Sequence, residues 1–108
     1  MGAKLDKNGY APSILTGWEK VCLITGVDSG DLVRHEIYYG IKNRAISKKY
    51  GFWCYLVPEL HNTSKNGVHF NKELDLSLKK TAQTKFEETH TREEFIKLIG
   101  RNYLWQTV

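Results

Sequence analysis

Three of the four histidines in the chain lie between residues 35 and 69, where expected strands end or turn. His35 falls on an expected strand, His61 follows a second one, and His69 comes two residues before an expected helix. Neutral imidazoles bind divalent transition metals, and a strand, loop and helix can bring such positions to one point. The three histidines are therefore candidate metal ligands. The alternative is that each is a surface residue or a buried residue with its own hydrogen bonds.

The stretch between Glu36 and Glu59 has four basic residues and no acidic one, so it carries a net positive charge. Basic side chains alternate there with aromatic ones, namely Lys42, Arg44, Lys48 and Lys49 with Tyr38, Tyr39, Tyr50, Phe52 and Trp53. Such a mixture suits a polyanion with stackable bases. The alternative is that the lysines cover the outer face of a short helix and the aromatic residues belong to the core. The net charge of +4 is compatible with a nucleic-acid partner.

The composition predicts one globular domain. The chain has 108 residues, of which 41% are hydrophobic, enough for a single core. No stretch approaches the roughly 18 uncharged apolar residues of a membrane span, and the N-terminus has no apolar secretory segment. We therefore expect a cytoplasmic protein without a membrane partner. The two cysteines, Cys22 and Cys54, are interpreted as small buried hydrophobes and are too few for a four-cysteine zinc site.

The expected elements change from strands to helices along the chain. An irregular arm at 1–17 precedes strands at 18–24, 32–39 and 52–57, with either a short helix or a long basic loop at 41–50. An amphipathic helix then follows the N-cap Asn71, because apolar residues recur every four positions at Leu74, Leu78, Ala82 and Phe86. A capping box of Thr91 and Glu94 opens a second helix, which ends at Gly100. This order predicts an α+β domain over 18–108.

An ordered set of segments resembles the small HNH-type proteins encoded by phages and prophages of Gram-positive bacteria. The segments are LVRHEIYYG at 32–40, NR at 43–44, YGFWCYL at 50–56, HN at 61–62, GVHFNKELDL at 67–76, REEFI at 92–96 and GRNYL at 100–104. The likeness covers about residues 12–104. It implies a ββα-metal finger over about 32–85, a hairpin and a helix that hold one divalent cation against a scissile phosphate, with two additional C-terminal helices, the last at about 91–100.

The resemblance also implies roles for individual residues. His35 takes a metal-binding place, Glu36 the place of the general base, and Asn43 the place of an Asn that orients the base or the loop. His61 matches the second-strand metal ligand, and His69 is the candidate for the remaining one. The metal would be Mg²⁺, Mn²⁺, Ni²⁺ or Zn²⁺. It would stabilise charge that develops on the phosphate while a base takes a proton from the attacking water.

Two positions depart from the general pattern. A His usually serves as the base, since neutral imidazole suits proton transfer near pH 7, whereas this chain has Glu36. Either Glu36 acts as a carboxylate base, or His35 is the base and Glu36 a ligand. The Cys-x-x-Cys pairs of many HNH domains are also missing, since the first is reduced to Cys22 with Thr25. The finger must therefore be held by its aromatic core and C-terminal helices, without a structural four-cysteine zinc.

These considerations lead to a functional hypothesis with two alternatives. The leading one is an HNH-type DNA endonuclease in the cytoplasm of a bacterial host, with phosphate contacts from Arg34, Lys42, Arg44, Lys48, Lys49 and Lys65. The second hypothesis is a phage protein with the same fold but no catalytic activity, which inhibits a host defence nuclease in the manner of an anti-CRISPR protein. A third is a DNA-binding accessory protein in phage replication or packaging.

Overall fold

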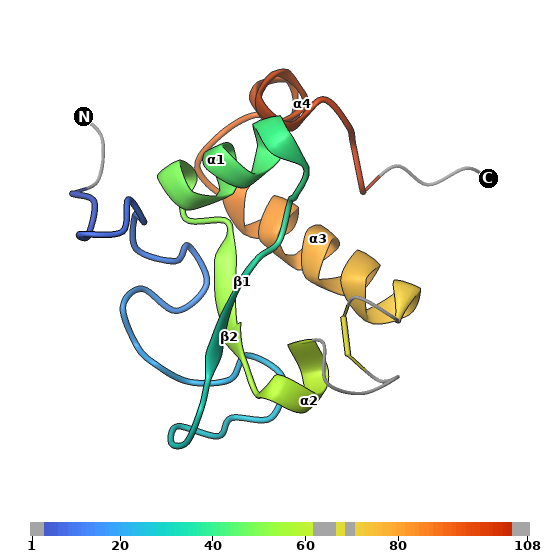
Figure 1. The fold of residues 1–108 in the computed structure, drawn as a ribbon. Helices are drawn as coiled ribbons and strands as arrows, with labels where there is room; N and C mark the ends of the chain where they lie inside the picture. Colours follow the sequence, from blue (N-terminus) through green and yellow to red (C-terminus); the bar gives the residue numbers. More distant parts are fainter. Residues whose placement is uncertain (1–3, 62–66, 69–70, 105–108) are drawn as a thin grey trace.

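A two-stranded antiparallel sheet runs through the middle of the protein in the computed structural model (Figure 1), which describes residues 4–61, 67–68 and 71–104. The elements follow the order β1 (Val33–Glu36), α1 (Ile41–Tyr50), β2 (Trp53–Leu56), α2 (Pro58–His61), α3 (Lys72–Phe86) and α4 (Arg92–Ile99). The predicted α+β class is therefore confirmed. Within the described ranges, no helix is both long and apolar enough to cross a membrane.

The register of the hairpin determines which side chains share a face. His35 is opposite Cys54 and Glu36 is opposite Trp53. Because side chains alternate along a strand, Arg34 and Glu36 project from one face of β1 and His35 from the other. All four residues of β2 are buried. Polar side chains at this hairpin therefore come from β1.

The stretch at 41–50, for which the sequence allows a helix or a loop, is helix α1. It ends at Gly51, whose left-handed φ of 78° is a typical helix C-cap. The buried hydroxyl of Ser47 accepts a hydrogen bond from the backbone N–H of Tyr38 (3.1 Å) and donates one to its carbonyl oxygen (2.6 Å). These two bonds fix α1 against the chain that leaves β1.

The prediction of a strand at 18–24 is wrong. Only Cys22 forms a bridge there, to Tyr55. The segment folds back on itself, because the N–H of Cys22 donates to Val27 (2.8 Å) and that of Gly26 donates to Cys22 (2.9 Å). Gly26 permits this turn with a φ of 78°. The local turn uses both backbone groups of Cys22, while the N–H of Leu23 donates to the carbonyl oxygen of Tyr55 in β2 (3.0 Å).

The two C-terminal helices begin at the predicted caps, and the second ends at Gly100 as predicted. The side chain of Asn71 accepts a hydrogen bond from the N–H of Leu74 (3.1 Å), and Thr91 and Glu94 form the complete capping box. Phe52, which directly precedes β2, packs with Phe86 and Phe95, and these contacts join the start of β2 to α3 and α4. The aromatic core thus connects the hairpin to both helices.

The N-terminal arm packs onto the hairpin. The indole N–H of Trp53 donates to the carbonyl oxygen of Ala11 (2.7 Å), and the hydroxyl of Ser13 donates to that of Trp53 (2.7 Å). Gly51 lies directly beneath the arm, because a Cβ atom there would overlap with the carbonyl oxygen of Pro12. These contacts hold the arm next to the end of β1.

Candidate functional site

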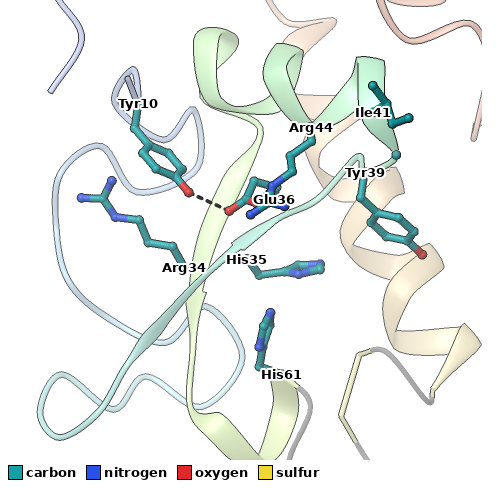
Figure 2. A pocket seen from close by; sticks show the side chains of 9 residues that line it. Tyr10, Arg34, His35, Glu36, Tyr39, Ile41, Arg44 and His61 are labelled. Atoms are coloured by element: carbon teal, nitrogen blue, oxygen red, sulfur yellow. Dashed lines mark hydrogen bonds and ion pairs between the residues drawn. The ribbon is translucent and has the colours of Figure 1, made fainter. Parts of the chain in front are cut away.

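A cavity of about 580 Å³ opens where β1 ends and α1 begins (Figure 2). It collects residues from the arm, β1, the turn to α1, α1 itself and α2. Its lining consists of Tyr10, Arg34, His35, Glu36, Tyr39, Gly40, Ile41, Arg44 and His61. Five of the residues singled out in the sequence therefore border one space, namely Arg34, His35, Glu36, Arg44 and His61.

Two histidines from different elements meet in this cavity. His35, on β1, is buried, with 2% of its surface exposed, and His61 is the last residue of α2. Their ring centroids are 5.4 Å apart, with ring planes at 69° to each other. Figure 2 shows His61 directed from α2 toward His35. The hairpin and the short helix thus bring together two imidazoles that are 26 positions apart in the sequence.

The donor set fits part of a transition-metal site. Imidazole nitrogens suit Zn²⁺, Ni²⁺ and similar ions, which take three or more protein ligands in most sites. Among the residues that the structure describes, no group of three or more His, Cys, Asp or Glu side chains could hold a metal ion. His69, the third ligand implied by the resemblance, lies outside the described residues, as does Lys65. The described residues therefore bring two imidazoles together, and their role as metal ligands stays a prediction, as does that of His69.

Both carboxylate oxygens of Glu36 accept hydrogen bonds within the protein. Oε2 accepts from the hydroxyl of Tyr10 (2.7 Å, dashed in Figure 2), and Oε1 accepts from Nε of Arg44 (2.9 Å). Burial of the phenol, together with its hydrogen bond to Glu36 and the negative charge there, raises the pKa of Tyr10 to about 12. The phenol therefore stays protonated and donates at neutral pH. Glu36 is held in one orientation by two donors from opposite sides.

The two arginines of the cavity differ in their contacts and in their exposure to solvent. Arg34 pairs with Asp6 (Nη1 to Oδ2, 2.8 Å) and stacks over the rings of Tyr10 (4.4 Å) and Trp53 (4.6 Å). The N–H of Tyr10 and the Arg34 guanidinium lower the pKa of Asp6 to about 2, which keeps this pair charged. The side chain of Arg34 is 24% exposed, whereas that of Arg44 is 69% exposed. Arg44 is therefore the more accessible cation for an anionic ligand.

Other candidate residues lie on α1 outside the cavity lining. Nδ2 of Asn43 donates to the carbonyl oxygen of Ile99 (3.0 Å), a contact that joins α1 to the end of α4. Lys42 and Lys49 are exposed, and the ammonium group of Lys48 lies 4.9 Å from the ring centroid of Tyr10. The lysines give α1 a basic outer surface beside the cavity, while the side chain of Asn43 is directed toward α4.

Neither Tyr10 nor Ile41 was singled out as a site residue in the sequence, although both line the cavity. Tyr10 lies in the arm, and no local pattern connects it to Glu36. Ile41 was assigned only to an uncertain helix, although its place directly after Gly40 marks the start of α1.

Comparisons with protein-family models, with curated proteins and with solved structures find no match to this chain. The fold and the site thus define a small α+β protein whose cavity joins two imidazoles, a fixed carboxylate and two guanidinium groups.

Proposed function

We propose that the protein is an HNH-type, metal-dependent endonuclease of phage or prophage origin that hydrolyses phosphodiester bonds in DNA. One observation carries the proposal, namely the meeting of the His35 and His61 rings at 5.4 Å in a cavity that also contains Arg44. Under this proposal β1, β2 and α3 correspond to the ββα-metal finger, with α1 inserted between the strands. The basic outer surface of α1 supports DNA as the partner.

His35 and His61 would hold the divalent ion, with His69 as the third ligand that the resemblance implies. Nitrogen donors favour Ni²⁺ or Zn²⁺ over Mg²⁺ and Mn²⁺, which prefer carboxylate and water oxygens. Such an ion supplies charge stabilisation at the phosphate. Arg44 would contact a phosphate oxygen at the mouth of the cavity, because a guanidinium group can donate more than one hydrogen bond to such a group.

The proton acceptor is either Glu36 or His35. Tyr10 and Arg44 orient the Glu36 carboxylate, which would place it for proton transfer if it is the base. If His35 is the base, it does not hold the metal, and Glu36 would take the place of the ligand. The two alternatives respond differently to Glu36→Gln, which keeps the shape but removes the charge. In the first case cleavage is lost at every metal concentration, because the base is gone. In the second case the variant binds the metal more weakly, so added metal restores part of the cleavage.

A plasmid-nicking assay in Mn²⁺, Ni²⁺ or Mg²⁺ tests the proposal. Wild type is expected to nick supercoiled DNA, while His61→Ala and His35→Ala lose the activity. His90→Ala is the matched control, because His90 is exposed and stacks on Phe86, away from the cavity. Equal nicking by wild type and His61→Ala would reveal a contaminating nuclease and would remove the support for this proposal.

One observation favours a second candidate, a catalytically silent HNH-like protein that binds and inhibits a host defence nuclease. Both oxygens of Glu36 already accept hydrogen bonds, so a carboxylate at the base position is committed to Tyr10 and Arg44. In this case wild type is inert with every metal, and Glu36→His gains nicking activity. Inhibition of a CRISPR-type nuclease by the purified wild-type protein would then support the second candidate directly.

A further inference from the structure

Ile41 is a fully exposed apolar side chain at the edge of the cavity. It is the first residue of α1, borders the cavity and is 102% exposed. Tyr39, two residues earlier, borders the same cavity and is 47% exposed. Figure 2 shows both on the side of the cavity that faces away from Tyr10 and Arg34. One wall of the cavity is thus charged and the other is apolar and aromatic.

The ring of Tyr39 is fixed in place by α3. Its hydroxyl donates to Oδ2 of Asp75 (3.1 Å), and the ammonium group of Lys79 lies 4.3 Å from the ring centroid. Lys79 also pairs with Asp75 at 2.8 Å, so all three side chains form one cluster. Between Tyr39 and Ile41 the chain turns at Gly40, with a φ of 94°. Ile41 therefore projects from a helix start that is anchored on both sides, through Tyr39 and through α1.

The surroundings of Ile41 are positively charged. Helix α1 has no acidic residue in its first turn, and Gly40 provides no side-chain cap, so the positive end of the helix dipole is not compensated locally. Lys42 and Arg44 follow on the exposed surface. An apolar tip among cations matches the minor groove of duplex DNA, where inserted apolar side chains unstack a base step and flanking cations contact phosphates.

We propose that Ile41, supported by Tyr39, is a wedge that enters the minor groove of a DNA duplex bound at the cavity and unstacks one base step. The inference rests on the DNA-binding part of the proposed function and does not depend on cleavage. Unstacking is easiest at pyrimidine–purine steps such as TA. The wedge therefore gives the protein a preference for flexible duplex without any hydrogen bond to a base.

Binding of a short fluorescein-labelled duplex that contains TA steps and one 2-aminopurine, measured in EDTA so that no cleavage occurs, tests the wedge. Fluorescence anisotropy reports affinity, and 2-aminopurine brightens when it loses its stacking neighbours. Ile41→Ala should bind about tenfold more weakly, because it loses part of an apolar contact, and should abolish the brightening. Ile41→Leu should restore both. Ile96→Ala, on α4 and 39% exposed, is the control for removing an exposed isoleucine elsewhere.

The salt dependence separates the wedge from the charged contacts. Ile41→Ala should leave the slope of log K against log salt unchanged, because it removes no phosphate contact. Wild-type affinity and wild-type brightening in Ile41→Ala would overturn the wedge while leaving DNA binding intact. No binding of the duplex by wild type would overturn the wedge together with the DNA-binding proposal. Binding with brightening but without nicking activity in metal would support the wedge and contradict only the endonuclease.

Discussion

The hydroxyl of Tyr10 donates a 2.7 Å hydrogen bond to Oε2 of Glu36 across 26 positions of sequence. It ties the N-terminal arm to the end of β1, at the residue that occupies the place of the general base in the resemblance to HNH proteins. Arg44 binds the other oxygen of the same carboxylate. The arm is thus part of the candidate site. The protonation state of Tyr10 should therefore report on the contact between the arm and Glu36.

We predict that burial of the Tyr10 phenol, together with its bond to Glu36, makes stability depend on pH in the alkaline range. The pKa of Tyr10 rises from 10.0 to about 12 in the folded protein, so the folded state holds this proton more tightly than the unfolded state does. The resulting stabilisation is fully present below pH 10 and is lost as the pH rises toward about 12. Urea unfolding at several pH values should show this loss in wild type and a smaller loss in Tyr10→Phe.

Glu36→Gln tests whether the negative charge of Glu36 contributes to the raised pKa of Tyr10. Removing the negative charge should lower the pKa of Tyr10 toward its ordinary value, although burial of the ring will keep part of the shift. Ultraviolet difference titration of the tyrosines measures this directly. An unchanged tyrosine titration in Glu36→Gln would contradict the contact between the two residues.

A second prediction concerns the place where the N-terminal arm packs closely over Gly51. Gly51→Ala should destabilise the protein by about 2–4 kcal/mol, because it combines the strain of a positive φ with overlap against the backbone of the arm. Gly30→Ala is the control, since Gly30 also has a positive φ of 86° but nothing lies within 4 Å of the added Cβ. We expect about 1 kcal/mol for Gly30→Ala in urea unfolding. Equal losses for the two variants would show that the arm does not pass closely over Gly51.

A third prediction concerns the basic surface of α1. Lys42→Gln should weaken DNA binding similarly for all sequences and reduce the salt slope of log K by about one unit, if Lys42 contacts one phosphate. Lys97→Gln, which removes an exposed charge from α4, changes the net charge by the same amount. Anisotropy titrations over a range of salt concentrations compare the two. The same slope for both variants would mean that α1 does not contact the backbone of DNA.

The parts of the fold that could be predicted from the sequence are those with local causes. Helix α4 begins at a capping box and ends at a left-handed glycine, and both signals lie within ten residues of each other. Asn71 similarly marks the start of α3 through a bond to Leu74. Trp18–Ile24 was also predicted as a strand, from a loose alternation of apolar residues. It failed because the turn at Gly26 satisfies its backbone locally, and strand pairing depends on a distant partner.

The candidate site was predictable only in part for the same reason. His35 and His61 could be placed at element ends from local patterns, and the structure brings them together. The contact of Tyr10 with Glu36 is encoded by the path of the arm, which has no periodicity. The direction of the Asn43 side chain depends on whether residues 41–50 form a helix, which the sequence left open. In α1 this side chain reaches α4 instead of the cavity.

Metal binding by the histidine pair tests the central claim most directly. Titration of the ¹⁵N-labelled protein with Zn²⁺, followed through the imidazole nitrogens by NMR, should shift the resonances of both His35 and His61 and saturate at one ion per chain. The resonances of His90 should not move. His61→Ala should weaken binding at least about tenfold, since it removes one ligand of the ion. Shifts of His90 alone, or no saturable shift of His35 and His61, would contradict the metal site and the endonuclease proposal that depends on it.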